Sequence, residues 1–270
     1  MIIDAWIQHP TPEFLGHPMF ASLRRWMGID RIPPVIPVKS TLAVLDAAGV
    51  ERAMVSAWCS DRGWLLTNDQ VAEVVAAAPD RFVGVGSVDL RDPMQAVRTV
   101  RDCAARGFRA IRVLPWMWDL PPNDRRYYPV YVACVEAGLP FCTQIGHTGP
   151  LRSSAYGRPI PYLEDVLIDF PELTVVGGHV GMPWIDEVLS LAYKCPNFYI
   201  DTSAYKVTRL PPALVRFMGG AGRTRVLFGS NYPMIPPAAC LEGLDQLGLD
   251  DEARGLFLAG NARRVFGLRG

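Results

Sequence analysis

The chain has 270 residues, half of them hydrophobic, which suits a single domain with one large core. Its 27 lysines and arginines balance 27 aspartates and glutamates, so we expect no surface that attracts nucleic acid or an anionic membrane. The first residues lack a basic segment followed by a long apolar core, and no apolar run approaches about 18 residues, so no signal peptide or membrane span is expected, and we predict a cytoplasmic protein.

Cysteine usage agrees with that location. The six cysteines form no Cys-x-x-Cys pair, and most fall inside apolar runs or helical patterns. This is typical of buried free thiols in a reducing compartment. Only Cys59, which follows a predicted strand, remains a candidate thiol nucleophile.

Short runs rich in apolar and β-branched residues alternate with amphipathic helical patterns along the whole chain. The predicted strands are Ile2–Trp6, Ala53–Ala57, Phe82–Val88, Ala110–Leu114, Pro140–Ile145, Leu173–Gly178, Phe198–Thr202 and Arg225–Gly229. The main helical patterns are Thr41–Ala48, Asn68–Ala78, Pro93–Arg106, Tyr128–Ala137, Met182–Lys194 and Pro211–Met218, with a last helix in 250–270 outside the barrel. Eight such repeats favour a closed parallel sheet, so we predict an α/β fold, a single-domain (β/α)8 TIM barrel over 1–270.

The longest irregular segment, 9–38, separates the first strand from its helix. Loops of this length are usually lids or binding loops, and the helical patch Met19–Met27 carries apolar side chains suited to covering the barrel mouth. We interpret His9 and His17 within it as structural residues.

A histidine ends the sixth predicted strand, in the stretch Gly177-Gly178-His179-Val180-Gly181. The carboxyl ends of barrel strands carry the chemistry of such folds, so His179 is a candidate catalytic base. The alternative is a turn histidine that caps the next helix.

Polar and aromatic residues recur at or just past the other strand ends. The predicted site residues are Trp6, Gln8, Trp58, Arg112, Trp116, Gln144, His147, His179, Asp201, Ser203 and Asn231. The tryptophans favour a planar or largely apolar substrate, although each ring alone is compatible with core packing.

Several of these residues allow two interpretations. Arg112 would either point inward and bind a substrate carboxylate or pair with an acid between helices. Asp201 would orient an imidazole or cap a loop. The glycines around His147 would let the backbone approach a ligand or only shape a turn.

These stretches together resemble the amidohydrolase superfamily, in the branch of aminocarboxymuconate semialdehyde decarboxylase and related lactone hydrolases. The similar pieces are Ile2-Ile3-Asp4, Gly107–Arg112, Gly138–Phe141, Gly178–Gly181, Pro196–Ser203 and Leu227–Pro233, which span nearly the whole chain. The resemblance implies a TIM barrel, often dimeric, that acts on a small molecule.

The resemblance also implies a divalent metal held by Asp-x-His-x-His on the first strand, a histidine ending the fifth strand and an aspartate ending the eighth. This chain has Trp6 and Gln8 in the first motif, Gln144 on the fifth strand and Asn231 on the eighth. Indole cannot bind zinc and neutral amides are poor ligands, so we predict no tightly bound metal and no other cofactor.

Without a metal-activated water, a protein base is required, and the lactone hydrolases of this branch that need no metal support that interpretation. We therefore expect a metal-independent hydrolase of a small, planar, carboxylated lactone or activated ester. His179 would be the general base, with His147 and Asp201 as further catalytic residues. Arg112 would bind the substrate carboxylate. The donors to the oxyanion would be the amides of Gln8, Gln144 and Asn231. The alternatives are a decarboxylase of an aromatic or enone acid, and a barrel that binds a ligand without catalysis.

Overall fold

The computed structural model describes residues 1–269, which form a single-domain TIM barrel. Eight parallel strands follow one another in the order β1-β2-β5-β6-β7-β8-β9-β10. Their bounds are Ile3–Ile7, Arg52–Ser56, Phe82–Gly86, Ala110–Arg112, Phe141–Gln144, Val175–Gly178, Phe198–Asp201 and Val226–Leu227. All eight predicted strands are confirmed, with small differences at their ends.

The segment after β10 closes the barrel by pairing with β1. Ala5 N donates to Phe228 O at 2.9 Å, and Gln8 N donates to Tyr232 O at 2.8 Å. This closure brings the residues after the last strand beside the end of the first, which places Asn231 next to Trp6: its backbone N donates to Trp6 O at 2.8 Å.

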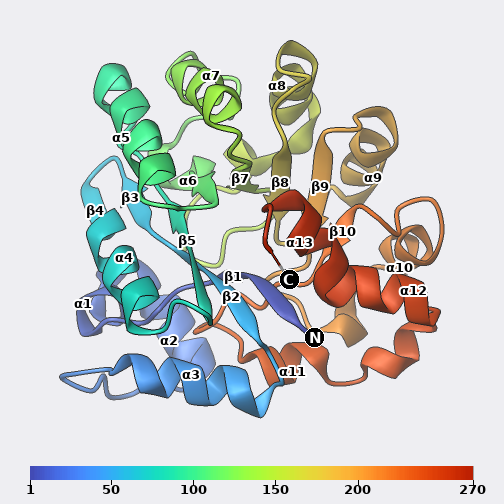
Figure 1. Ribbon diagram of the computed structural model, residues 1–270, viewed down its shortest axis with the longest axis horizontal. Coiled ribbons are helices and arrows are strands. Elements are labelled where there is room, and N and C mark those ends of the chain that lie inside the picture. The colour runs from blue at the N-terminus through green and yellow to red at the C-terminus, as the bar shows by residue number, and fades with distance from the viewer. Residues whose placement is uncertain (270) are drawn as a thin grey trace.

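Helices surround the strands, as Figure 1 shows. The helices that follow predicted patterns are α3 (Val38–Ala47), α4 (Asn68–Ala77), α5 (Pro93–Ala105), α7 (Tyr128–Ala137), α9 (Ile185–Lys194) and α10 (Pro212–Gly219). Shorter helices are α6 (Pro115–Trp118), α8 (Glu164–Asp169) and α11 (Pro237–Leu241). The amphipathic stripes of the long helices supply the outer core: Val100 and Cys103 of α5, for example, are fully buried.

The sequence missed one element and predicted another correctly. A hairpin of β3 (Trp58–Ser60) and β4 (Gly63–Leu66) lies where no strand was expected. The predicted last helix is confirmed: α12 (Asp251–Gly255), a π-helical turn and α13 (Asn261–Val265) follow one another without a break. Ala262 of this helix packs with Ile3 and Leu227 of the strands.

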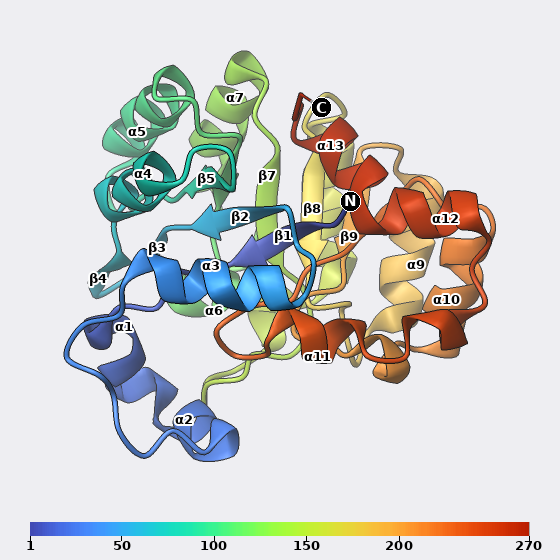
Figure 2. The same cartoon turned by 60° about the horizontal axis from the view of Figure 1, so that its bottom comes forward.

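The long segment after β1 contains α1 (Pro12–Gly16), a 3-10 turn and α2 (Ala21–Met27). Figure 2 shows α1 and α2 extending from one end of the barrel, beyond the strands. The structural interpretation of its two histidines agrees with their contacts. His9 bonds Thr41 Oγ1 at 2.9 Å, and His17 accepts from Met19 N at 3.3 Å.

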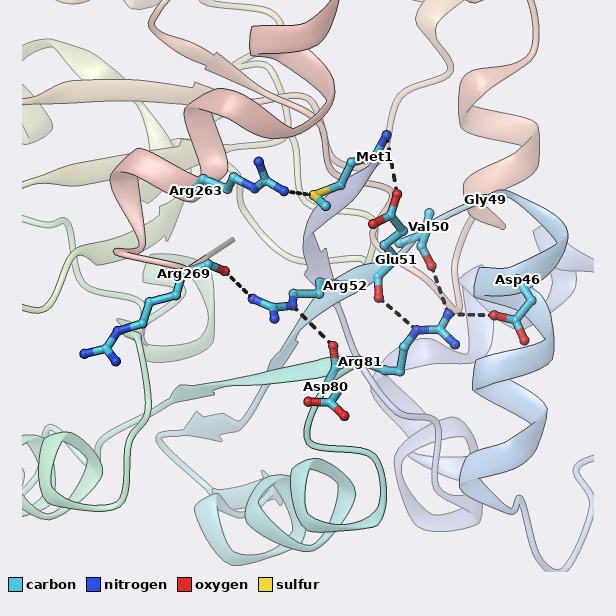
Figure 3. A pocket seen from close by; sticks show the side chains of 10 residues that line it. All are labelled: Met1, Asp46, Gly49, Val50, Glu51, Arg52, Asp80, Arg81, Arg263 and Arg269. Atoms are coloured by element: carbon cyan, nitrogen blue, oxygen red, sulfur yellow. Dashed lines mark hydrogen bonds and ion pairs between the residues drawn. The ribbon is translucent and has the colours of Figure 1, made fainter.

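A hollow of about 530 Å³ lies beside the chain start, away from the strand ends that carry the predicted site (Figure 3). Its arginines hold the local backbone: Arg81 donates to Glu51 O at 2.8 Å and pairs with Asp46, and Arg52 donates to Arg269 O at 2.8 Å. The amino-terminal end of a barrel serves stability, and these contacts fit that role. No helix among the described residues is long and apolar enough to cross a membrane.

Candidate active site

A cavity of about 400 Å³ opens among the residues that follow the strands, between them and α2. Its walls are mostly aromatic and aliphatic, and they include six of the predicted site residues: Trp58, Trp116, Gln144, His147, His179 and Asn231. Residues beyond the prediction are Ser22, Thr148, Gly149, Pro150, Ala204, Tyr205, Met234 and Ile235. The expectation that the helical patch covers the mouth agrees with Phe20, Leu23 and Trp26, which also line the cavity.

The residues that reasoning from strand ends missed lie further along the same loops. Tyr205 follows the predicted Ser203, and Met234 and Ile235 follow Asn231. Counting only the first residues past each strand therefore underestimated how far these loops fold back over the barrel.

His179 follows β8 in a strained backbone conformation. Within the described residues, five that are not glycine have positive φ, and four of them, His179, Val180, Ala204 and Asn231, lie at this end of the barrel. Such conformations cost free energy and cluster at functional sites. Gly178 allows the approach of the neighbouring ring, because a Cβ there would overlap the indole of Trp6.

The imidazole of His179 is held on three sides. Its Nδ1 lies 2.8 Å from Ser203 Oγ, its Nε2 lies 3.4 Å from Asn231 Nδ2, and its ring centroid lies 4.6 Å from that of Trp6. Burial, and then the charge of Arg112, lower the pKa of His179 to about 3. The imidazole is therefore neutral at physiological pH, and His179 lines the cavity.

Ser203 and Asp201 differ in role from the prediction. Ser203 is fully buried and lies behind His179, so it does not contact a substrate in the cavity as expected. Asp201 does not touch the imidazole: its Oδ1 accepts from Ser203 N at 2.7 Å, and the serine lies between the two. Burial raises the pKa of Asp201 to about 6, although Arg112 and the hydrogen bonds of Ser203 act in the opposite direction.

Arg112 points inward, as one of its two interpretations predicted, but it is 1% exposed and does not line the cavity. Its guanidinium carbon lies 3.8 Å from the ring centroid of Trp6, and its Nη2 donates to Ala5 O at 3.2 Å. The expectation that it anchors a substrate carboxylate does not fit this position. Its charge instead acts on the buried Asp201, whose pKa it lowers against the effect of burial.

Asp4 is a second buried acid at the base of the site. Its Oδ1 accepts from Trp6 N at 3.1 Å and from Ser230 N at 2.9 Å, so it ties β1 to the segment after β10. Burial raises its pKa to about 7, against the hydrogen bonds of Ser230. These contacts make Asp4 a structural link between the two edges of the closed barrel.

Gln8 is fully buried beside Asn231 and does not line the cavity. One orientation of its amide satisfies all of its neighbours: the oxygen accepts from Trp6 Nε1, and the nitrogen donates to Asn231 Oδ1 at 3.3 Å and to Tyr232 O at 3.0 Å. Both ends of this amide are thus engaged by protein groups, which does not fit the predicted role as an oxyanion donor.

Gln144 and His147 lie on the opposite wall. Gln144 accepts from Trp116 Nε1 at 2.7 Å and donates to His147 O at 2.5 Å, so the side chain joins two residues of the cavity. His147 is exposed, and its Nδ1 lies 3.4 Å from Ser154 Oγ. The neighbouring Gly146 shapes a turn: a side chain there would collide with the backbone of Gly181.

Cys59 does not have the properties of a nucleophile. It is 2% exposed, and burial followed by the charge of Asp89 raises the pKa of its thiol to about 12. All six cysteines are buried free thiols.

The residues at the positions where the resemblance implies metal ligands do not fit a divalent ion. The indole of Trp6 packs against a guanidinium, and the amides of Gln8 and Gln144 are engaged in the bonds given above. No group of three or more His, Cys, Asp or Glu side chains converges in the part of the chain that the structure describes. Indole and amide groups are poor partners for such a cation.

Comparison with known proteins finds similar decarboxylases, described first, and a similar hydrolase, described below. The γ-resorcylate decarboxylase of Rhodococcus jostii (strain RHA1) is 24% identical over 254 residues, 74% of this chain and 75% of the relative. A solved dihydroxybenzoic acid decarboxylase from Polaromonas sp. JS666, with bound manganese, has TM-score 0.74 and 18% identity and covers 100% of this chain and 98% of its own.

Two further solved structures are similar over almost the full length. An uncharacterised TIM-barrel protein from Bordetella bronchiseptica has TM-score 0.85 and 28% identity, with 98% of both chains covered. A probable 2-pyrone-4,6-dicarboxylic acid hydrolase from Acinetobacter baumannii has TM-score 0.68 and 17% identity, with 99% of both chains covered. The amidohydrolase family model matches residues 8–268, and the chain belongs to this family.

Proposed function

We propose that this amidohydrolase-family enzyme hydrolyses a small, planar lactone or activated aryl ester without a divalent metal, with His179 as the general base. The observation that carries the proposal is the position of the imidazole. His179 lines the cavity, its Nδ1 lies 2.8 Å from Ser203 Oγ, and burial lowers its pKa so that the ring is neutral. A neutral imidazole in this arrangement can accept a proton from water.

The chemistry proceeds in two proton transfers. When a water molecule replaces the 3.4 Å contact with Asn231 Nδ2, His179 Nε2 takes a proton from it as the water oxygen bonds to the substrate carbonyl carbon, which gives a tetrahedral oxyanion. When the carbon–oxygen bond to the leaving group breaks, the imidazolium returns the proton to that oxygen. Asn231 and Gln144 line the cavity, and each carries a second amide N–H beyond the bond described above; we assign these N–H groups as the donors to the oxyanion.

The walls favour an uncharged substrate over the carboxylated one that the sequence predicts. Trp58 and Trp116 form flat apolar surfaces, and no lysine or arginine lines the cavity within residues 1–269. A carboxylate bound there would lose its hydration without gaining a charged partner. Leaving-group activation must come from the substrate itself, which favours lactones and aryl esters over ordinary amides.

Decarboxylation is the second candidate, and the curated decarboxylase relative with its aromatic substrate favours it. The aromatic walls would desolvate a carboxylate, and His179 or the exposed His147 would supply the proton to the ring carbon. The absence of a cation from the described cavity walls is the reason we place it second.

One assay separates the two reactions. Purified protein, dialysed against a chelator, is incubated with aryl esters and unsaturated lactones, and separately with dihydroxybenzoates, while acid release and carbon dioxide release are followed. We expect the wild-type protein to release acid from the esters. We expect His179→Gln to lower the rate of this release by ~10² or more, the usual contribution of a general base. Carbon dioxide release with no ester hydrolysis would replace the proposal by the second candidate. Activity that is lost on chelation and restored by manganese would refute it.

A further inference from the structure

Trp6, Gln8, Asn231 and His179 form a series of hydrogen-bonded side chains. The first member, Trp6, fixes which group donates and which accepts at each following contact. Trp6 Nε1 can only donate a hydrogen bond. It donates to the Gln8 oxygen, which turns the Gln8 nitrogen toward Asn231 Oδ1 at 3.3 Å and Tyr232 O at 3.0 Å. The indole therefore decides which way the buried Gln8 amide faces.

The same direction passes to the imidazole through Asn231. Because its oxygen accepts from Gln8, its nitrogen faces His179 Nε2, at 3.4 Å. The N–H of Asn231 is better placed opposite a lone pair of Nε2 than opposite an N–H of the ring. This favours the form of His179 in which Nε2 carries no proton.

The series ends at Ser203 on the other side of the ring. His179 Nδ1 lies 2.8 Å from Ser203 Oγ, and the same oxygen accepts from His179 N at 3.3 Å. A hydroxyl oxygen can accept two hydrogen bonds, so Ser203 Oγ can also accept from Nδ1–H. Asn231 thus favours the Nδ1–H tautomer, and Ser203 is a suitable acceptor for it.

We propose that Trp6, Gln8 and Asn231, together with Ser203, are positioning residues that hold His179 as the Nδ1–H tautomer with Nε2 unprotonated toward the cavity. Three of the four occupy positions where the family resemblance implies metal-binding side chains. The catalytic meaning of the tautomer rests on the proposed function, whereas the tautomer itself does not.

Burial makes the direction hard to reverse. Trp6 and Ser203 are no more than 1% exposed, Gln8 is fully buried and Asn231 is 7% exposed, so water has little access to replace a lost bond. Turning the Gln8 amide would set its N–H groups against the indole N–H and its oxygen against two acceptors. Like groups facing each other without solvent are unfavourable.

The test is nitrogen NMR of the full chain labelled with ¹⁵N-histidine at neutral pH. We expect one pyrrole-type nitrogen, Nδ1, and one pyridine-type nitrogen, Nε2, for His179. In Gln8→Glu the carboxylate still accepts from Trp6 but cannot donate, so Asn231 turns its nitrogen to the new acid and its oxygen to His179. Nε2 then gains a proton, and kcat falls by ~10² with a smaller change in KM.

Gln144→Glu is the matched control, because it makes the same change in the other amide that accepts from an indole, outside the series. It should leave the two nitrogen signals of His179 in place. If Gln8→Glu does not fold, Asn231→Asp serves instead, since its carboxylate also presents only acceptors to Nε2.

A wild-type protein with a proton on Nε2, or a folded Gln8→Glu or Asn231→Asp protein in which Nε2 stays unprotonated, would overturn the inference. The signals are read without substrate. If the protein shows the expected tautomer but hydrolyses no ester, the proposed function is wrong, whereas the inference about the hydrogen-bonded series is not affected.

Discussion

The burial of a neutral His179 predicts a specific dependence of stability on pH. The pKa of this imidazole falls from 6.5 to about 3 on folding, because burial and then Arg112 disfavour the charged form. The unfolded chain consequently binds more protons between these values. The cost of keeping His179 neutral is absent above pH 6.5 and grows as the pH falls below it.

The size of the effect follows from the two pKa values. At pH 5 an ordinary imidazole is almost fully protonated, and the difference between the folded and unfolded pKa then costs about 2 kcal/mol of unfolding free energy. At pH 7.5 the same cost is close to zero. His179→Gln removes the titrating group, so the variant should gain about 2 kcal/mol relative to wild type when the pH falls from 7.5 to 5.

The assay is urea unfolding of both proteins at the two pH values, followed by tryptophan fluorescence. Hydrogen bonds lost in the variant lower its stability at both pH values and cancel in the comparison. The titrations of Asp4 and Asp201 occur in both proteins, and His179 is not among the causes of their raised pKa values. His147→Gln is the matched control, since it removes an exposed imidazole of the same cavity. A stability difference between wild type and His179→Gln that does not change with pH would refute the reasoning.

Three further predictions concern the pH dependence of activity, Arg112 and Cys59. The acid limb of kcat/KM against pH should extend below pH 5, because the low pKa of His179 keeps the base unprotonated there; a midpoint near 6.5 would contradict the burial argument. Arg112→Met should lower the unfolding free energy by about 3–5 kcal/mol in urea titrations, since it leaves Asp201 buried without the cation that lowers its pKa; a loss below about 1 kcal/mol would show that the charge of Asp201 is not offset by Arg112. Cys59→Ala should retain ester hydrolysis within a factor of about two, and loss of turnover in a folded variant would restore the thiol as a candidate nucleophile, against its pKa of about 12.

The arrangement of apolar runs and helical stripes is sufficient to predict the barrel. Each parallel strand is covered on both faces, so its sequence is almost continuously apolar, and this local pattern survives without knowledge of the contacts. The hairpin after Trp58 escaped prediction because its strands are short and its pairing depends on a turn, not on a repeating pattern. The predicted C-terminal helix is present, and the contact of Phe266 with the strands is visible only in the closed sheet.

The identities at the strand ends also predict that an imidazole, several amides and indoles meet at one mouth. Position along the chain does not decide which of them touch. Arg112 and Trp116 are near neighbours in sequence, yet the first lies beneath Trp6 while the second lines the cavity. Likewise Asp201, expected to orient His179, is separated from it by Ser203.

The barrel, the set of polar residues at its mouth and the loss of the family's usual ligand types follow from the sequence alone, because periodicity and residue chemistry are local properties. Burial and the direction of the hydrogen bonds follow only from the folded arrangement of these residues. Closure of the last strand on the first brings Asn231 to Gln8 and Trp6, and desolvation then gives these bonds a single direction and lowers the pKa of His179.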